Sequence, residues 1–387
     1  MLVERGANVH SLERALIHAA ERGHYEVVTL LLSLGADNAA VDKNWFTALH
    51  SAARNGHLMA VRALLSQPQG DVNTRKWSIK PVHLAALHGH VAVVQELLER
   101  GANCDVVDEL VGTPLHVAAR GGHIETISLL LDHVENPHGS VGIEGKTPLH
   151  CAVESGSLRA TNLLLEHGAD PNVATAKEHR TPLHIAADAG DVVILKRLLE
   201  CCVRVDAQLK DSKLTPFLNA AYYGHVDCLK ALRRVGANIY ATTGRWPYEE
   251  NVADGMTAMH LAGGNVDIVK AMLEFSTEDA VLLGQDACGH TPFFYAFLNW
   301  ELDSCRLLLK HAGDKKEMFL NEDVNGWKPI HVACKSGKVE FVQLLLDFGA
   351  DIDIPTKEEG YTPEVSRLLV EQKANAVMAG EQEACLT

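Results

Sequence analysis

Hydrophobic residues recur along the chain in short stripes with helical spacing. After Gly122, the apolar residues Ile124, Ile127, Leu130 and Leu131 stand at i, i+3, i+6 and i+7. This spacing puts their side chains on one face of a helix with 3.6 residues per turn. A helix of this length is marginal in isolation, so it must pack its apolar face on a neighbour. The pattern therefore predicts many short helices that share a common core.

A second kind of segment precedes each stripe. Its clearest copy reads Thr-Pro-Leu-His-Val-Ala-Ala-Arg-Gly-Gly-His over residues 113–123. Threonine is favoured at the N-terminal cap of a helix, and proline is favoured at the first helical position. The paired alanines allow two helices to approach closely, and Gly122 is favoured just after a helix end. The phrase predicts a short first helix, followed by the second helix that carries the stripe.

The phrase repeats in register along the chain. Threonine holds its first position in most copies, lysine in two and arginine in the earliest one. These positions are Arg14, Thr47, Lys80, Thr113, Thr147, Thr181, Thr215, Thr257, Thr291, Lys328 and Thr362. The early steps are 33 or 34 residues long, whereas the step from Thr215 to Thr257 is 42. A fixed period of this length is typical of a stacked repeat protein.

The phrase and its period resemble the ankyrin repeat, and the resemblance covers nearly the whole chain. It implies an all-α repeat solenoid of stacked helix-turn-helix units with short β-hairpin fingers between them. It also implies that the histidine of the phrase forms a hydrogen bond between adjacent units. The histidines at that position are His50, His83, His116, His150, His184, His260 and His331, and those that follow the glycine are His24, His57, His90, His123 and His225.

The spacing divides the chain into five parts. Residues 1–13 form a partial N-terminal unit, and residues 14–239 form the regular units one to seven. Residues 240–256 are an extended finger insertion. Residues 257–361 form the irregular units eight to ten, and residues 362–387 form a C-terminal capping helix and tail.

Composition narrows the class of partner and the compartment. The formal net charge is −15, so repulsion from phosphate backbones disfavours nucleic acid as a partner. The nine cysteines include no C-x-x-C pair, which favours free thiols in a reducing, intracellular compartment, either cytoplasm or nucleus. No apolar run is long enough for a membrane span, and the N-terminal residues do not resemble a signal peptide.

Candidate chemistry is sparse in the sequence. It holds no Gly-rich phosphate loop, no H-E-x-x-H and no G-x-S-x-G motif. More than half of the 21 histidines fall at the two repeated positions, where packing accounts for them. We therefore expect no catalysis, no cofactor and no metal.

The resemblance also implies where a partner binds. In ankyrin proteins the concave groove is lined by the finger tips and by the exposed side of each first helix. By register, the candidate partner-binding residues are Lys43, Trp45, Phe46, Arg54, Lys76, Trp77, His88, Leu110, Arg120, Tyr222, Tyr223 and Trp327. The first part of this set is basic and aromatic, with Glu109 alone against four cations. It predicts an acidic or aromatic-rich partner segment. In an alternative, Trp45 and Phe46 fold back onto a neighbouring finger and serve stability only.

The expected function is a non-catalytic scaffold or adaptor that binds one or more proteins along its groove and acts as a monomer. The alternative is an ankyrin module of a larger assembly, such as a substrate receptor for ubiquitin ligation or a cytoskeletal or channel adaptor. No appended domain is visible in the sequence, which favours the first reading. The sequence does not identify the partner.

Overall fold

The computed structural model describes residues 9–67, 70–74, 79–139, 144–244, 254–320 and 327–351. The chain divides into two compact units, Met1–Arg204 and Val205–Thr387, a division that the repeat spacing did not predict. The described residues of both units form short helices, and their one β-bridge is an isolated pairing of Asp108 with Gly112. None of these helices is both long enough and apolar enough to cross a bilayer.

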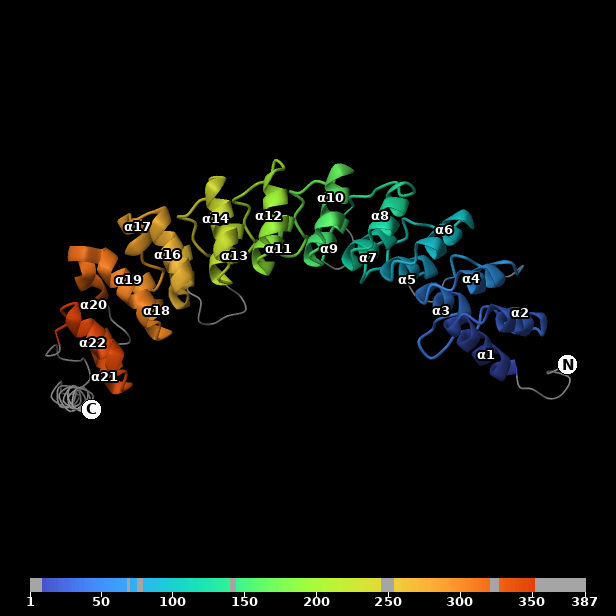
Figure 1. Ribbon diagram of the computed structural model, residues 1–387, viewed down its shortest axis with the longest axis horizontal. Helices are drawn as coiled ribbons and strands as arrows, with labels where there is room; N and C mark the ends of the chain where they lie inside the picture. The colour runs from blue at the N-terminus through green and yellow to red at the C-terminus, as the bar shows by residue number, and fades with distance from the viewer. Residues whose placement is uncertain are drawn as a thin grey trace, which may run out of the picture. The chain divides into compact units, whose positions relative to one another are not determined.

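The first unit consists of consecutive helix pairs (Figure 1). The pairs are α1 (Val9–Arg22) with α2 (Tyr25–Ser33), α3 (Ala48–Arg54) with α4 (Leu58–Leu65), α5 (Pro81–Leu87) with α6 (Val91–Glu99), α7 (Pro114–Gly121) with α8 (Ile124–Leu131), α9 (Pro148–Glu154) with α10 (Leu158–Glu166), and α11 (Pro182–Ala189) with α12 (Val192–Leu199). Each first helix packs on the first helix of the next pair, and second helices pack on second helices. The predicted all-α repeat architecture is confirmed.

The repeated phrase starts each first helix as the sequence predicts. In α9, the Thr147 hydroxyl accepts a hydrogen bond from the His150 amide, and the Thr147 amide donates to His150 Nδ1 at 3.1 Å. These reciprocal bonds satisfy amide groups that a helix start leaves unpaired. At the other end of a first helix, Gly122 follows α7 with φ 67°, in the left-handed region where glycine carries no steric penalty.

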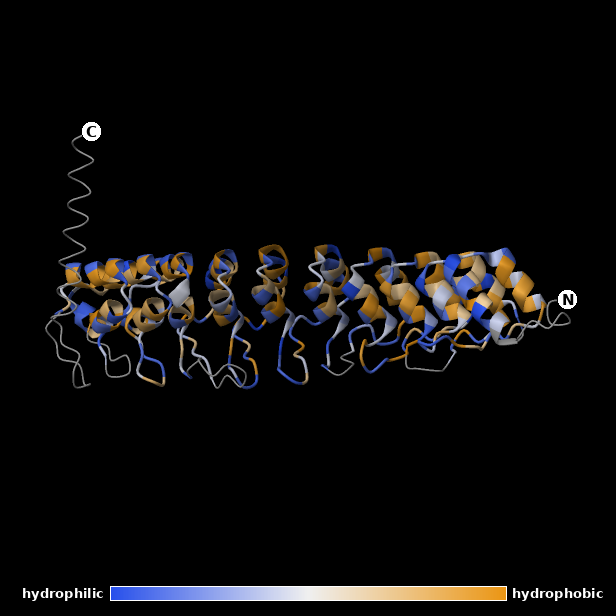
Figure 2. Ribbon diagram, turned by 90° about the horizontal axis from the view of Figure 1, so that it is seen from below, coloured by the Kyte–Doolittle hydropathy of each residue, from blue (hydrophilic) through white to orange (hydrophobic). Residues whose placement is uncertain are grey.

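The core of each unit lies between the two layers of helices (Figure 2). The paired alanines of the phrase, such as Ala118 and Ala119, are fully buried, and so are Ile127 and Leu130 of the predicted stripe. Small side chains on the first helix let the next pair approach closely, and the larger aliphatic side chains fill the space behind them. Hydrophobic burial therefore runs from pair to pair within a unit, as in other repeat proteins.

The second unit is less regular. Its helices are α13 (Pro216–Tyr222), α14 (Val226–Arg234), α15 (Ala258–Leu261), the 3₁₀ turn η1 (Ala262–Gly264), α16 (Val266–Phe275), α17 (Asp279–Leu282), α18 (Pro292–Leu298), α19 (Leu302–Ala312), η2 (Gly313–Lys316), α20 (Glu317–Leu320), α21 (Pro329–Lys335) and α22 (Val339–Asp347). In the eighth unit, which starts at Thr257, the first helix is shortened to α15 and continues as η1. Aromatic rings fill the core beside it, with Phe293 stacked on Phe319 at 5.1 Å and Trp300 edge-on to Phe341 at 5.2 Å.

The structure revises two expectations about the repeat units. Helix α1 begins at Val9, so the boundary expected between residues 13 and 14 falls inside a helix, and Arg14 does not cap one. The fingers project from one edge of each unit (Figure 2), and where the structure describes them they are closed by isolated backbone bonds or a single bridge rather than by β-strands. An example is the bond from the Asp42 amide to the Phe46 carbonyl at 3.0 Å.

The base of the predicted extended finger is closed by the backbone. At the base of the predicted extended finger, Thr243 and Met256 are joined by a backbone bond of 2.9 Å. Residues 245–253 of that finger, and the capping helix and tail expected over 362–387, lie outside the described residues.

Candidate functional site

The finger between α2 and α3 is held by one carboxylate. Asp42 Oδ1 accepts hydrogen bonds from the amides of Asn44 at 2.8 Å and Phe46 at 2.9 Å. The turn leaves Lys43, Asn44 and Trp45 exposed at its tip. Trp45 has φ 64°, in the left-handed region that favours glycine; Gly145, Gly255 and Gly289 take this place in other fingers, whereas His179 and Lys213 take it in two more. A side chain there costs about 1–2 kcal/mol, so an exposed tryptophan is held in a strained turn.

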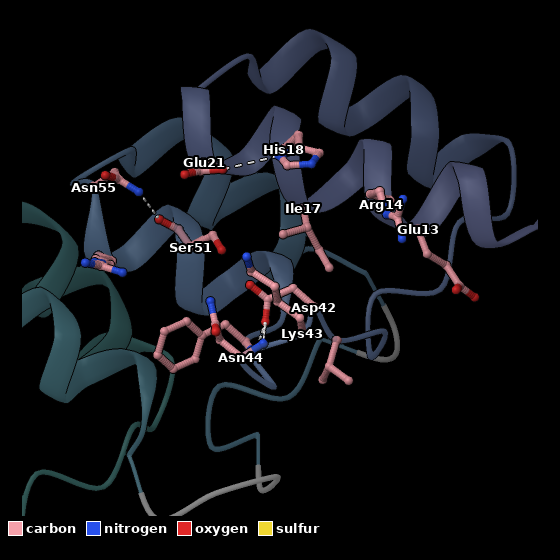
Figure 3. Close-up of a pocket in the computed structure, with 13 residues that line it drawn as sticks. Glu13, Arg14, Ile17, His18, Glu21, Asp42, Lys43, Asn44, Ser51 and Asn55 are labelled. Carbon is pink, nitrogen blue, oxygen red and sulfur yellow. Dashed lines mark hydrogen bonds and ion pairs between the residues drawn. The ribbon is translucent and has the colours of Figure 1, made fainter.

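A hollow of about 710 Å³ lies between this finger and helices α1 and α3 (Figure 3). We call it the N-terminal pocket. Helix α1 contributes its side that faces the finger, the finger contributes its inner edge, and α3 contributes its C-terminal end. The lining residues are Glu13, Arg14, Ile17, His18, Glu21, Val41, Asp42, Lys43, Asn44, Phe46, Ser51, Arg54 and Asn55.

Three of the predicted partner-binding residues meet in this pocket: Lys43, Phe46 and Arg54. Phe46 is half-buried and stacks on His50 of its own unit, with ring centroids 5.6 Å apart and planes 16° apart. Part of the Phe46 side chain therefore serves stability, and its remaining surface lines the hollow. Trp45 is adjacent in sequence, is 51% exposed and does not line the pocket.

The pocket is less basic than predicted, because the predicted set contains no residue of the first helix pair. Helix α1 brings Glu13 and Glu21 to the lining, together with one more cation, Arg14. Glu21 could have been found, since it stands between the alanine pair and the glycine of its unit, as Arg54 does in the next. Glu21 is 3.3 Å from His18 on the same helix.

The cations of this unit differ in their ion pairing. Lys146 lies 2.6 Å from Glu144 and 2.7 Å from Glu154, and Arg180 pairs with Asp188. The hydrogen bond from Lys146 lowers the pKa of Glu144. Within the part of the chain that the structure describes, Lys43 and Arg54 have no ion-pair partner. The N-terminal pocket thus holds two cations, Lys43 and Arg54, that pair with no described carboxylate, although Glu13, Glu21 and Asp42 also line it.

The other predicted residues of the first unit do not line the pocket. His88 is exposed just after α5, and its pKa is lowered by partial burial and by the positive charge of Arg54. Leu110 is 74% exposed on its finger, and the Arg120 guanidinium lies 3.8 Å from the Cys151 thiol. Lys76 and Trp77 lie outside the described residues.

In the second unit, the exposure expected for Trp327 is wrong. Its side chain is only 7% exposed, and the Lys335 ammonium sits 4.2 Å from the ring centroid. The His331 ring of α21 also contacts the indole edge to face at 6.4 Å, so the buried Trp327 belongs to the core. Tyr222 is half-buried, and Tyr223 is 53% exposed, with the two rings edge to face at 5.0 Å.

The repeated histidines join neighbouring units, as the resemblance implied. Nε2 of the phrase histidine lies 3.0–3.3 Å from a carbonyl of the following finger, and burial lowers the pKa of these imidazoles to about 4. The histidines with both properties are His50, His83, His116, His150 and His260.

A second set of histidines forms hydrogen bonds to the preceding repeat unit. His57, His90 and His123 each place Nε2 at 2.9–3.0 Å from a carbonyl of the preceding unit's first helix. Two of those carbonyls belong to Glu21 and Arg54, which line the N-terminal pocket. The histidines therefore fix the backbone from which the pocket side chains extend.

Comparisons with known proteins agree with this architecture. A family model described as ankyrin repeats in three copies matches residues 1–76, 82–175 and 173–243, and a single ankyrin repeat matches residues 325–357. Together these matches cover more than half of the chain.

Curated relatives match over shorter stretches. The human SH3 and multiple ankyrin repeat domains protein 2 is 33% identical over 131 residues, which are 33% of this chain and 6% of that protein. A candidate E3 ubiquitin-protein ligase of Arabidopsis thaliana, XBAT34, is 34% identical over 143 residues, covering 34% of each chain. Human protein phosphatase 1 regulatory subunit 27 is 34% identical over 104 residues, or 27% of this chain and 63% of that protein.

These matches span less than two thirds of each relative, so they carry over the repeat and not the activity of the whole protein. The repeated phrase, the stacked helix pairs and the histidine bonds between units agree with the family match. On these grounds the chain belongs to the ankyrin-repeat family.

Proposed function

We propose that this chain is a non-catalytic protein-interaction scaffold whose N-terminal pocket binds an extended, acidic segment of a partner protein. The observation that carries the proposal is the pocket itself, which Phe46 lines together with Lys43 and Arg54, two cations with no ion-pair partner among the described residues. Arginine and aromatic side chains in a hollow are favoured anchors of protein interfaces.

The charged side chains of the pocket define which partner segment it can bind. A carboxylate of the partner would lie between Lys43 and Arg54, and an apolar or aromatic side chain next to it would cover Phe46. Partial withdrawal from water strengthens such ion pairs relative to those on an open surface. The α1 side of the pocket adds Glu13 and Glu21, which repel an acidic part of the segment and attract a basic or polar one, and Arg14, which does the reverse.

The strained finger adds support. Trp45 stands in a backbone conformation that favours glycine, and half of its side chain is exposed beside the pocket. A costly residue at an exposed turn is typical of a functional surface. The proposed partner segment extends from the pocket across the Trp45 ring.

The absence of catalysis is part of the proposal. It is supported by the family match and by the human relative named as a phosphatase regulatory subunit. The buried imidazoles of the repeat form structural hydrogen bonds, which occupies the groups that would otherwise serve as acids or bases.

We further propose that the chain acts as a monomer inside the cell, in the cytoplasm or nucleus, with proteins rather than nucleic acids as partners. The net charge of −15 supports the choice of partner. The compartment is supported by the buried thiols of Cys104, Cys151 and Cys305.

A charge reversal tests the pocket. The variant Lys43→Glu/Arg54→Glu changes both cations, and its matched control Arg159→Glu/Lys196→Glu changes two exposed cations of α10 and α12 by the same charge. A library of displayed peptides is selected against the purified wild-type chain, and the enriched peptides are titrated against all three proteins. We expect acidic peptides that bind wild type and control equally and the pocket variant at least about 10-fold more weakly. Equal binding of the peptides to all three proteins would refute the proposal that the partner segment binds in the pocket.

A second candidate function is that of an ankyrin module within a larger assembly, such as a substrate receptor for ubiquitin ligation or a cytoskeletal or channel adaptor. It is favoured by the small share of the human SH3 and ankyrin protein that is matched, 6%, and by the relative named as a candidate ubiquitin ligase. Size-exclusion chromatography of the endogenous protein separates the two. Elution in a stable high-mass complex supports the module, and elution at monomer size supports the free-standing scaffold.

A further inference from the structure

One finger of the second unit brings three metal-binding side chains together. Asp286, Cys288 and His290 each offer a ligand atom, and these atoms lie within 4.8 Å of one another. Asp286 is buried, His290 is half-buried and Cys288 is exposed. His290 belongs to neither of the repeated histidine positions, so the inter-unit bonding of the imidazoles does not explain it.

The turn fixes the aspartate and leaves one of its oxygens directed at the histidine. Asp286 Oδ1 accepts the amides of Cys288 at 2.8 Å and His290 at 2.9 Å. Asp286 Oδ2 lies 3.7 Å from His290 Nδ1 and accepts a hydrogen bond from the Tyr295 hydroxyl. The carboxylate is therefore held in place before any ion binds.

The finger at Asp42 is a built-in comparison. It has the same carboxylate turn, with Asn44 and Phe46 at the positions of Cys288 and His290. Both fingers stack a phenylalanine on a histidine, but the two residue types stand in exchanged positions. Phe46 stacks on His50, whereas His290 stacks on Phe294 at 3.8 Å with planes 11° apart. The turn thus requires neither the thiol nor the imidazole, and the stack sets the plane of the His290 ring.

We propose that Asp286, Cys288 and His290 bind a Zn²⁺ ion. Thiolate, imidazole and carboxylate are the ligands that zinc takes in proteins, and a mixed set of this kind does not suit Ca²⁺ or Mg²⁺. Ligand atoms of a tetrahedral zinc site stand about 3.3–3.6 Å apart, given bonds of about 2.0–2.3 Å. Asp286 and His290 are near that separation, and rotation of the exposed Cys288 side chain brings the sulfur in.

The binding step is balanced by a proton. Zinc displaces the proton of the Cys288 thiol, which leaves to solvent, and the imidazole binds in its neutral form. Three protein ligands leave a fourth position to water. The Tyr295 hydroxyl bond to Asp286 Oδ2 orients the carboxylate, so Tyr295 is a positioning residue.

Cobalt reports the ligands directly. The full chain is reduced, stripped with a chelator and titrated with Co²⁺, which takes the same ligands as zinc and gives a thiolate-to-metal charge-transfer absorption. We expect one Co²⁺ per chain with that absorption, and its loss on addition of Zn²⁺. Absence of the band in the wild-type chain would overturn the proposal.

Variants assign the band to this finger. Cys288→Ser removes the thiolate, and His290→Phe installs the residue that the finger at Asp42 carries, so both should fold, as circular dichroism would verify. We expect Cys288→Ser to lose the band and His290→Phe to bind zinc more than about 100-fold more weakly. The control Cys202→Ser removes another exposed thiol and should change neither. A band that survives in Cys288→Ser places the metal elsewhere and contradicts the site.

Tyr295→Phe tests the positioning role. Loss of a hydrogen bond to a ligating carboxylate typically weakens metal binding about 10- to 100-fold. We expect that weakening in a competition titration against a zinc chelator, with the charge-transfer band retained because the ligands are unchanged. Unchanged affinity would remove Tyr295 from the site.

Discussion

At the residue scale, the repeated histidine is the side chain that ties one unit to the next. His116 shows how both ring nitrogens are used. A carbonyl can only accept, so Nε2 carries the proton in its bond to the Lys146 carbonyl at 3.1 Å. An amide can only donate, so Nδ1 is unprotonated beside the Thr113 amide. Protonation of the ring would break the second bond, which makes the neutral form part of the fold.

This role predicts a pH dependence. Burial lowers the pKa of His116 from its ordinary 6.5 to about 4, so the unfolded chain binds the extra proton between these values. The stabilisation is complete above pH 6.5 and is lost as the pH falls toward 4. One such histidine should contribute a loss of roughly 2 kcal/mol between pH 7 and pH 5. Urea unfolding of wild type and His116→Gln at both pH values measures it, and an equal pH dependence in both proteins would contradict the assignment.

Trp45, unlike His116, has a conformation that lowers the stability of the fold, because its backbone is strained and its side chain is exposed. Trp45→Gly relieves the left-handed conformation, so we expect the free energy of unfolding to rise by up to about 1 kcal/mol. We also expect weaker binding of the selected acidic peptides, by at least about threefold. Thermal unfolding and peptide titration test the two halves. A less stable variant with unchanged binding would show that the ring serves stability, which is the alternative that the sequence left open.

At the element scale, the sequence predicts the helices well because each carries its own start and stop signals. Thr147 caps α9 and Gly122 ends α7, both at the predicted positions. It misses the start of α1 because Arg14 has no capping chemistry, and the helix extends back to Val9. It misses the burial of Trp327 because register gives the position of a residue but not the side chains that cover it.

The candidate site was predicted in part for the same reason. The register brings Lys43 and Arg54 to one edge, since finger and first helix alternate regularly. The balancing charges of Glu13 and Glu21 come from a unit whose phrase is degenerate. The three proposed zinc ligands are visible as Asp-x-Cys-x-His in the sequence, but only the turn shows that their ligand atoms converge.

The shortened eighth unit predicts an asymmetry between two adjacent glycines of η1. A Cβ at Gly263 would lie 2.7 Å from Tyr295 Cβ, whereas a Cβ at Gly264 would meet nothing closer than 3.4 Å. We expect Gly263→Ala to destabilise the second unit by about 1–3 kcal/mol, because packed side chains and backbone must move. Gly264→Ala is the matched control and should change stability little. Equal effects, measured by chemical denaturation, would show that η1 is not tightly packed on α18.

At the scale of the whole molecule, each of the two units has its own continuous core. The functional features are distributed between them. The N-terminal pocket belongs to Met1–Arg204, and the turn with the proposed zinc ligands belongs to Val205–Thr387. Because each repeat of a repeat protein contacts mainly its neighbouring repeats, changes at one site should leave the other intact.

The central claim is that a partner segment binds in the pocket between α1, the finger at Asp42 and α3. Hydrogen exchange with mass spectrometry, on the full chain with and without a selected acidic peptide, tests it most directly. We predict slower exchange over residues 42–55 and the C-terminal half of α1, with α4 and α6 unchanged. Protection confined to the second helices, or to the second unit, would contradict the claim.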